Sequence, residues 1–409
     1  MTGSFFYFII PCMKILAIET SCDETSVAIV ETSGAQRQPK FRVLAHFVSS
    51  QMKLHAKFGG VVPNLAKREH QRLLVPLTLQ ALKKAGILNN SKVKSPSPLD
   101  GIKNKLQIIF ERELALLAVF EKKILLLEAP DIDMIAVTNG PGLAPALWVG
   151  VNFAKALSLV WKKPIVPMNH MKGHLYAAFV PDAVRNKKIV QFPRVRFPAL
   201  ALLVSGGHTE LVLMKKLGSY EIIGETLDDA AGEAFDKVAR MFKLGYPGGP
   251  AIAAAAKMQN EKRKTKSIDI MFPRPMMLSK DFNFSFSGLK TAVLYALRDM
   301  PKSIPMSSVV PAMAKEFQDA AVDVLVHKTI RAAKQYSVNT IAIGGGVSAN
   351  YLLRERLAHE VKTQLPRTDL FLPHPSLTGD NALMIAIAAA VDGKKKAPNG
   401  IGAEPNMRL

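Results

Sequence analysis

The chain has 409 residues, 48% of them apolar, which is enough for two domains with buried cores. Its 54 Lys and Arg against 33 Asp and Glu give a formal net charge of +21, which favours a polyanionic partner such as nucleic acid over an acidic one. The alternative interpretation is that all proteins of the source organism are basic, in which case the positive charge would not indicate a particular partner. Only two cysteines, Cys12 and Cys22, are present, which excludes a disulfide framework and favours a reducing cytoplasm.

The first residues of the chain contain an apolar run at 5–10 with no basic residue before it, a pattern that is a poor match to a signal peptide. No later run approaches the ~20 apolar residues of a membrane span, so we expect no membrane association and a cytoplasmic location. A buried strand is predicted over residues 14–19. Met13 is therefore a candidate start, with residues 1–12 as an N-terminal extension.

The first predicted hairpin carries acids in its turn. Strands over residues 14–19 and 26–31 flank a polar turn that contains Asp23 and Glu24. A helix is predicted over residues 64–85. Residues 89–128 then interrupt the pattern, beginning with a Lys/Ser/Pro-rich link. Apolar residues near helical spacing over 106–127 predict one inserted amphipathic helix.

Two histidines, His170 and His174, follow a strand, helix and strand predicted over residues 133–138, 145–161 and 163–167. Four residues are about one helical turn, which places the two Cβ atoms roughly 5–6 Å apart on one helix face. Such a pair can share a metal ion, although two unrelated histidines are an equally simple interpretation. Zinc proteases carry the Glu base directly after the first His. Here that position is Met171, which argues against peptide hydrolysis.

A third metal ligand has to come from elsewhere, and Asp380 is the candidate because it precedes an apolar helix predicted over residues 382–391. An Asp at this place is also a good helix N-cap, so both roles stay open. Two His and one carboxylate suit Fe(II), or Zn with a replaceable water. The sequence does not choose between them.

Glycine-rich turns recur in the second half of the chain. Residues 205–209 lie between strands predicted over 199–204 and 210–214, and residues 344–350 follow a strand over 340–343 and open a helix. Such turns let backbone N–H groups approach a phosphate, although a plain hairpin turn is the simpler interpretation of the first. Asp236 and the pair Gly248 and Gly249 add a carboxylate and a tight turn. The repeated hairpin and βα pattern predicts two related α/β lobes that face one cleft.

Basic residues gather in three places, where they resemble phosphate contacts that add affinity without reading sequence. The three groups are Lys187, Lys188, Arg194 and Arg196; Lys257, Lys262, Arg263, Lys264 and Lys266; and Lys394, Lys395 and Lys396. Solvated surface charge is the alternative.

The motifs together resemble the TsaD family of tRNA threonylcarbamoyl transferases. The matching runs are residues 18–25, 59–63, 140–143, 169–174, 203–209, 228–237, 246–250, 284–291, 345–350 and 380–381. They occur in order from about Lys14 to the C-terminus. The resemblance implies an α/β fold of the actin/Hsp70/sugar-kinase type, with two ribonuclease-H-like lobes around a central cleft. On this basis we expect a first lobe over 13–165, with the insert at about 89–128, a second over 166–375, and a segment over 376–409 returning to the first.

The resemblance also implies the activity: transfer of the threonylcarbamoyl group from threonylcarbamoyl-adenylate to the adenosine 3′ of the anticodon in tRNAs that read codons beginning with A. It implies metal ligands at His170, His174 and Asp380. It implies essential acids at Glu24 and Asp23. The adenylate contacts that it implies are Leu203, Val204, Ser205, Gly206, Gly207, Asp236, Gly249 and Asn350. Members of the bacterial type act with a paralogous TsaB-like subunit and a TsaE-like ATPase, whereas a mitochondrial-type homodimer needs neither.

Two departures from the family pattern stand close to these residues. Lys172 replaces an acid between the histidines, and Glu210 replaces a common Gln after the glycine turn. The rival functions are a small-molecule kinase or an ATP-hydrolysing regulatory subunit of the same fold, and a metalloprotease, which the missing base disfavours.

Overall fold

The structure, a computed structural model, describes residues 9–35, 38–88, 99–180, 189–261 and 270–409. It divides into two compact units. Unit 1 comprises Met1–Lys53, Val61–Arg194 and Asp380–Leu409, and unit 2 comprises Leu54–Gly60 and Val195–Gly379. The expected end of the first lobe at residue 165 is therefore wrong. Unit 1 continues to Arg194 because the strand Ile189–Gln191 pairs with a strand of the first sheet and the histidine helix packs on the C-terminal helix.

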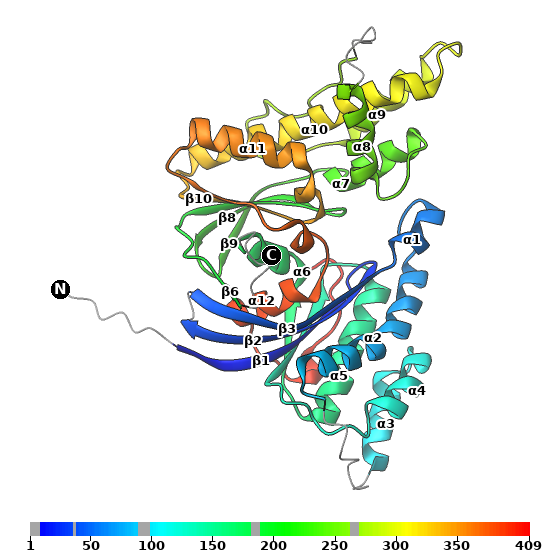
Figure 1. The fold of residues 1–409 in the computed structure, drawn as a ribbon, viewed down its shortest axis with the longest axis vertical. Helices are drawn as coiled ribbons and strands as arrows, with labels where there is room; N and C mark the ends of the chain where they lie inside the picture. Colours follow the sequence, from blue (N-terminus) through cyan, green and yellow to red (C-terminus); the bar gives the residue numbers. More distant parts are fainter. Residues whose placement is uncertain (1–8, 36–37, 89–98, 181–188, 262–269) are drawn as a thin grey trace, which may run out of the picture. The chain divides into compact units, whose positions relative to one another are not determined.

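Unit 1 is built on a six-stranded mixed sheet (Figure 1). Its strands are β1 (Ile9–Glu19), β2 (Glu24–Ala35), β3 (Gln38–Ser50), β4 (Met134–Gly140), β5 (Ile165–Asn169) and β6 (Ile189–Gln191), in the order β5-β4-β1-β2-β3-β6. The strands β1, β4 and β5 are parallel, whereas β2 and β3 run antiparallel to their neighbours. The first strand begins at Ile9 rather than Lys14, because β2 is long enough to pair Gly34 and Ala35 with Ile10 and Ile9.

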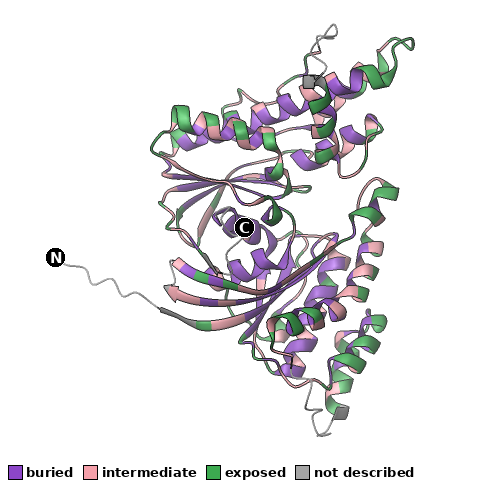
Figure 2. Ribbon diagram, in the orientation of Figure 1, coloured by how far each residue is buried: buried purple, intermediate pink, exposed green. Residues whose placement is uncertain are grey.

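Helices cover both faces of this sheet. Those of unit 1 are α2 (Pro63–Ala85), α3 (Leu99–Ile109), α4 (Leu114–Lys123), α5 (Ala144–Trp161), α6 (His170–Ala178) and α12 (Ala382–Asp392). Alternate strand residues such as Leu16 and Ile18 join the core under α2 and α5. The intervening residues Ile15 and Ala17 are equally buried on the other face, where α12 packs on β1 and β2 and on α6. Where both faces are covered the strands are apolar and buried, as at residues 15–18 of β1 and 27–30 of β2, whereas β3 has exposed residues such as Lys40 and Arg42 (Figure 2).

Among the described residues, α5 is the one helix long and apolar enough to cross a membrane, and most of it is buried. Figure 1 shows it against the sheet of unit 1 beside α2. A helix buried in the core of a protein can have the same length and apolar composition.

The insert consists of two helices, α3 and α4, so the prediction of one helix over residues 106–127 is wrong. The chain turns between Phe110 and Glu113 because the Glu113 carboxylate points inward. There it lies 3.3 Å from Nζ of Lys67 on α2 and accepts a hydrogen bond of 3.0 Å from Asn152 on α5. The predicted link at residues 89–98 lies outside the described residues.

Unit 2 contains a five-stranded sheet. Its strands are β7 (Ala199–Val204), β8 (Thr209–Lys216), β9 (Ser219–Glu225), β10 (Thr340–Gly344) and β11 (Asp369–Phe371), in the order β11-β10-β7-β8-β9. The order β5-β4-β1-β2-β3 of unit 1 has the same pattern of three antiparallel strands extended by two parallel ones. This repetition confirms the expected α/β fold of two related lobes.

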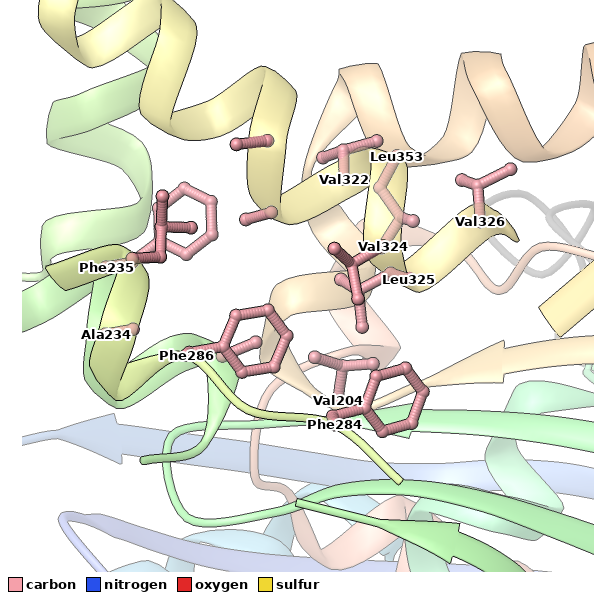
Figure 3. Packing of buried hydrophobic residues seen from close by; sticks show 14 of the residues in the cluster. Val204, Ala234, Phe235, Phe284, Phe286, Val322, Val324, Leu325, Val326 and Leu353 are labelled. Carbon is pink, nitrogen blue, oxygen red and sulfur yellow. The ribbon is translucent and has the colours of Figure 1, made fainter. Parts of the chain in front are cut away.

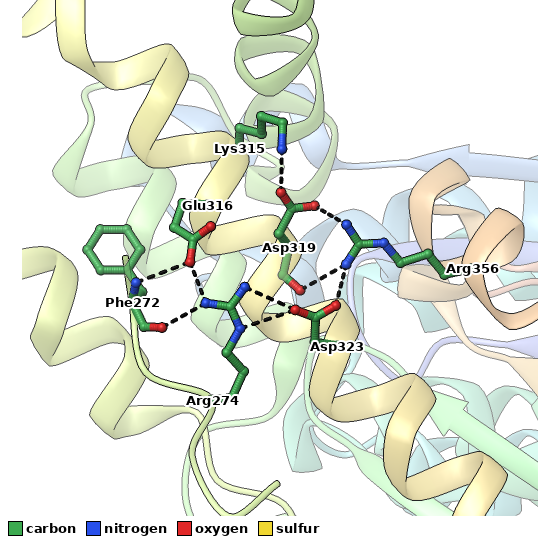
Figure 4. A network of polar contacts seen from close by, with 7 residues as sticks. All are labelled: Phe272, Arg274, Lys315, Glu316, Asp319, Asp323 and Arg356. Atoms are coloured by element: carbon green, nitrogen blue, oxygen red, sulfur yellow. Dashed lines mark hydrogen bonds and ion pairs between the residues drawn. The ribbon is translucent and has the colours of Figure 1, made fainter. Parts of the chain in front are cut away.

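The helices of unit 2 are α7 (Ala231–Met241), α8 (Gly248–Glu261), α9 (Ser287–Arg298), α10 (Met306–Gln335) and α11 (Tyr351–Gln364). The buried helix α10 is the centre of their packing: Leu325 belongs to one cluster with Val204, Phe284 and Phe286 (Figure 3). A polar network also ties α10 to its neighbours (Figure 4). Its members are Arg274, Lys315, Glu316, Asp319, Asp323 and Arg356.

Candidate functional site

The two histidines and Asp380 come together in unit 1. The strand β5 delivers the chain to Asn169, whose side chain caps α6 by accepting a hydrogen bond from the backbone N–H of Lys172. His170 and His174 then lie one turn apart, with ring centroids separated by 4.7 Å. Oδ1 of Asp380 lies 3.4 Å from Nε2 of His170 and 3.1 Å from Nε2 of His174.

These separations fit a shared metal ion. Two ligands at about 2.1 Å from one tetrahedral ion lie about 3.4 Å apart. The three ligand atoms all lie within 4.8 Å of one another, and both imidazoles are buried. Two nitrogens and one oxygen form a donor set that suits Fe(II) or Zn, so the residues present fit the expected ion.

A residue that the sequence did not single out, Glu19, supports this group from behind. Its Oε2 lies 3.2 Å from Nδ1 of His170 and accepts a hydrogen bond of 2.6 Å from Thr138, while Oε1 accepts one of 2.6 Å from the backbone N–H of Ser21. A carboxylate in this position keeps the proton on Nδ1 and presents Nε2 as the ligand atom. The one feature of the sequence that could have pointed to Glu19 is its position as an acidic residue at the end of an apolar strand.

The charges in this group are strongly coupled. Burial alone would lower the pKa of His170, but the carboxylates of Asp380 and Glu19 raise it well above its usual value. Burial alone would raise the pKa of Asp380, yet His170 and His174 hold it well below its usual range. The site therefore concentrates negative charge around two imidazoles, which is the environment that a cation requires.

Asp380 is not the helix cap that the sequence left open as its alternative role. The N-cap of α12 is Asn381, whose side chain accepts a hydrogen bond of 3.0 Å from the backbone N–H of Met384. Because Asn381 satisfies the helix end, the carboxylate of Asp380 is available to the histidines.

The acid turn between β1 and β2 lies near Asp380. Burial, followed by the charges of Asp380 and Asp23, raises the pKa of Glu24 to about 9. The hydroxyl of Ser50 on β3 donates a hydrogen bond of 3.0 Å to Glu24. The structure thus brings Glu24 within electrostatic range of both Asp23, the other expected acid, and Asp380, the candidate metal ligand.

A second residue that the sequence did not single out, His70 on α2, holds this turn. Its Nε2 lies 3.0 Å from the carbonyl oxygen of Cys22, and its Nδ1 lies 2.7 Å from the hydroxyl of Thr25. A carbonyl oxygen only accepts hydrogen bonds, so we assign the proton to Nε2. The side chain is fully buried in the middle of a helix, where nothing in the sequence distinguishes it from a core histidine.

The expected adenylate contacts all belong to unit 2, and five of them lie at the end of β7 and in the turn that follows it. Leu203 and Val204 have fully buried side chains at the end of β7, so they can offer a ligand only backbone groups. Ser205, Gly206 and Gly207 form the more exposed turn that follows. The hydroxyl of Ser205 accepts a hydrogen bond of 3.1 Å from the backbone N–H of His208, which closes the turn.

Close backbone approaches gather the other candidates around this turn. A Cβ on Gly345 would lie 2.4 Å from the carbonyl oxygen of Val204, and its φ of +84° also favours glycine. A Cβ on Gly232, at the start of α7, would lie 2.5 Å from the carbonyl oxygen of Ser205. The two glycines therefore allow β10 and α7 to reach the end of β7.

Asp236 and Asn350 also have structural partners here. Oδ1 of Asp236 accepts a hydrogen bond of 2.6 Å from the backbone N–H of Gly248, next to the expected contact Gly249. Asn350 caps α11 and donates a hydrogen bond of 3.0 Å to Gln318 on α10. Gln318 is thus a residue that orients a candidate ligand group, and no motif in the sequence marks it.

Lys172, the departure between the histidines, lies 2.8 Å from Oδ2 of Asp392 at the end of α12. It fixes α6 to α12 and supplies no ligand. Several members of the basic clusters lie outside the described residues, namely Lys187, Lys188, Lys262, Arg263, Lys264 and Lys266.

Comparison with known proteins shows the family of the chain. The family model described as "TsaD: tRNA N6-adenosine threonylcarbamoyltransferase" matches residues 42–92 and 120–387. A tRNA N6-adenosine threonylcarbamoyltransferase of Thermosipho melanesiensis is 41% identical over 397 residues, which cover 97% of this chain and 100% of that protein. One from Enterococcus faecalis is 40% identical, over 96% of this chain and 94% of its own length.

The chain belongs to the TsaD family. Its relatives carry the name of a transferase, so the chain is a member of an enzyme family. Among solved structures, HypF from T. kodakarensis aligns with 95% of this chain and 49% of its own, with a TM-score of 0.51 and 11% identity. That likeness concerns the fold alone. The TsaD family match skips residues 93–119, which include all of α3 and the start of α4.

Proposed function

We propose that this chain forms threonylcarbamoyladenosine in tRNA. The exocyclic amine of the adenosine 3′ of the anticodon, in tRNAs that read codons beginning with A, attacks the carbamoyl carbon of threonylcarbamoyl-adenylate. The new bond is carbon–nitrogen, the bond to the phosphate oxygen breaks, AMP leaves, and the amine loses one proton. The observation that carries the proposal is identity of about 40% to named transferases over almost the whole chain.

Unit 2 supplies the adenylate site in this proposal. The turn after β7 binds the phosphate through the backbone N–H groups of Gly206 and Gly207, because a glycine turn exposes donors to an anion and the N–H of Ser205 already donates to the carbonyl oxygen of His208. Asp236, Gly249 and Asn350 contact the remainder of the nucleotide. A bound, oriented acyl donor lowers the entropic part of the barrier, which matters for a nucleophile as weak as an aromatic amine.

Unit 1 supplies the metal site. His170, His174 and Asp380 hold one divalent ion, Fe(II) in the first place and Zn as the alternative. When bound, such an ion supplies Lewis-acid polarisation of carbonyl oxygens, worth several kcal/mol. Glu24 and Asp23 contribute the acidic groups of the first turn. Of the two candidates to accept the proton of the amine, Asp236 and Glu24, Asp236 is the stronger, because the pKa of Glu24 is raised to about 9 and its carboxyl is protonated at neutral pH.

The partners belong to the same proposal. A TsaB-like paralogue and a TsaE-like ATPase assemble with the chain in the bacterial type, and a homodimer replaces them in the mitochondrial type. The cytoplasm is the expected compartment, since tRNA is the macromolecular substrate.

A small-molecule kinase or an ATP-hydrolysing regulatory subunit would share the fold. The named relatives do not favour either function. A kinase would phosphorylate a sugar or an acyl acceptor with MgATP, and its activity would be independent of the two histidines. Phosphorylation that survives the substitution His174→Ala, with no modified nucleoside, would identify that alternative.

Nucleoside mass analysis tests the main proposal. A strain depleted of its own enzyme should regain threonylcarbamoyladenosine in its tRNA when this chain is expressed together with the partner subunits. The His174→Ala variant, expressed to the same level, is the matched control and should restore none. Absence of the modified nucleoside with the unaltered chain, despite a folded and assembled protein, would contradict the proposal.

A further inference from the structure

The C-terminal lysine run lies beside a second lysine pair at one edge of the unit 1 sheet. The strand β5 forms that edge, and Ile165 pairs with Lys396 in an antiparallel bridge, where the backbone N–H of Lys396 donates a hydrogen bond of 2.9 Å to Ile165. Lys162 and Lys163 directly precede β5. Two segments more than 200 residues apart in the sequence are thus brought together.

Local packing fixes both segments. A Cβ on Gly393 would lie 2.8 Å from a methyl carbon of Val166, so the chain leaves α12 in direct contact with β5. The hydroxyl of Ser158 donates a hydrogen bond of 2.6 Å to the carbonyl oxygen of Lys163. We call the resulting group of five, Lys162, Lys163, Lys394, Lys395 and Lys396, the lysine edge.

Among the described residues no ion pair compensates the positive charge of the lysine edge, although the charges of Asp131 and Lys163 attract each other at longer range. Four of its members are exposed and Lys163 is half-buried. In the described part of the chain, no carboxylate lies within ion-pair distance of any of the five. The acids nearby are engaged elsewhere: Asp392 with Lys172, and Asp131 with Lys14.

We propose that the lysine edge binds the sugar–phosphate backbone of the tRNA substrate. The inference rests on the proposed function, which makes tRNA the polyanion that this basic chain has to hold. Lysine is a flexible point charge, suited to phosphates rather than to reading bases. The lysine edge therefore contributes affinity and orientation to any tRNA and does not choose among tRNAs.

Lysines at the edge of a sheet have two further roles in proteins. They prevent pairing with another sheet, and a basic patch also attracts anionic lipid. RNA binding is favoured over both because the backbone bridge at Ile165 already occupies part of the edge, and because the family acts on tRNA. Edge protection and lipid binding are outcomes that the following experiment distinguishes from RNA binding.

The test compares two fourfold variants of the full chain. One changes Lys162, Lys394, Lys395 and Lys396 to Gln. The matched control changes Lys83, Lys84, Lys122 and Lys123, exposed lysines at the ends of α2 and α4, to Gln, and loses the same charge from the same unit. Equilibrium binding of a tRNA that reads codons beginning with A is measured from about 50 to about 300 mM salt, the range over which phosphate contacts weaken.

Each lost phosphate contact removes roughly 0.9 from the slope of log affinity against log salt. For the lysine-edge variant we expect a slope smaller by about 3, and an affinity at least about 10-fold weaker at about 150 mM salt. The control should keep both values close to those of the unaltered chain. In turnover assays the lysine-edge variant should show a raised KM for tRNA and an unchanged kcat, with unchanged binding of threonylcarbamoyl-adenylate.

An unchanged salt slope, or an equal loss in both variants, would overturn the inference. Self-association of the lysine-edge variant with normal tRNA affinity would also overturn it and would indicate that the lysines protect the sheet edge. A loss of binding to phosphatidylserine vesicles without a loss of tRNA binding would overturn it as well and would indicate lipid binding. If the unaltered chain forms no threonylcarbamoyladenosine, the proposed function fails. Nucleoside analysis of the unaltered chain measures this outcome, whereas the salt slopes of the variants measure tRNA binding, so the two failures can be distinguished.

Discussion

At the residue scale, Asp380 and Asn381 are adjacent in the sequence but have separate roles. Asn381 caps α12, and Asp380 reaches both histidines. We predict that Asp380→Asn, like His170→Ala, abolishes metal binding and transfer while the protein stays folded. The matched change Asn381→Ala should cost about 1 kcal/mol of stability and leave the metal in place.

Elemental analysis of both purified variants, together with their thermal unfolding, measures the two effects. Full metal occupancy in Asp380→Asn would contradict the assignment of the ligand. Loss of metal from Asn381→Ala at an unchanged unfolding temperature would contradict the separation of roles.

Glu19 is predicted to set metal affinity through the orientation of His170. Glu19→Ala should weaken metal binding by roughly 10–100-fold, as is typical when the hydrogen-bond partner of a metal-binding histidine is removed. Glu19→Gln keeps an oxygen acceptor for Nδ1 and should retain most of the affinity. Competition with a chelator of known affinity measures the metal affinity of each variant.

Thr138→Val is the control for this experiment. It removes one hydrogen bond from the same carboxylate without touching the histidine, so it should lower stability and spare metal affinity. Equal affinities of the Ala and Gln variants would show that Glu19 is only a core residue.

At the scale of elements, short apolar runs bounded by turn residues were predicted well, whereas the long helix α10 (Met306–Gln335) was not predicted. The strands over residues 199–204 and 340–343 and the helix over 382–391 match β7, β10 and α12, because each is a short apolar run bounded by turn residues. The strand β3 was missed. Its alternation is interrupted where its register with β2 shifts between Ile29 and Val30.

The candidate site shows the same division. One-turn spacing pointed to His170 and His174, the entry to an apolar helix pointed to Asp380, and glycines between strands or before a helix marked the glycine turns; the family resemblance then implied their roles. Glu19, His70 and Gln318 were missed, since each is a single buried polar residue whose partner lies far away in the sequence. No periodic pattern marks such a residue.

The insert is an element whose apolar face is buried within unit 1. Phe120 on α4 is fully buried between Phe110, directly after α3, and Phe153 on α5, with ring centroids 5.5 and 5.9 Å away. We predict that Phe120→Ala lowers the stability of unit 1 by about 3–5 kcal/mol. Leu114→Ala, on the same helix but 67% exposed, should stay within about 0.5 kcal/mol.

Chemical denaturation, followed by hydrogen exchange of unit 1 peptides, measures this difference. Identical midpoints for the two variants would indicate that the insert is a passive attachment that can be removed without effect.

At the scale of the whole molecule, unit 1 is discontinuous and needs its last segment, Asp380–Leu409. The helix α12 buries Leu383, Met384, Ile385 and Ile387 against the sheet and α6. At about 1.5–3 kcal/mol for each large apolar side chain, their loss equals the whole stability of a typical domain.

We therefore predict that a chain ending at Gly379 has a folded unit 2 and an unfolded unit 1. Hydrogen exchange should show protection in the strands β7, β8 and β10 and none in β1, β2 and β4. Addition of a peptide of residues 380–409 should restore protection to unit 1, which is the control for irreversible damage. Full protection of unit 1 without the peptide would disprove the prediction.

The late position of Asp380 has a consequence for biosynthesis. Domains usually fold from the N-terminus while translation continues, at about 5–20 residues per second. Here the unit that contains the N-terminus is the last to be completed, because the ribosome must first release all of Val195–Gly379 and then α12. A nascent chain therefore carries two histidines but no complete ligand set. For the proposed metal site, loading would then follow synthesis and would depend on whatever supplies the ion to the finished protein.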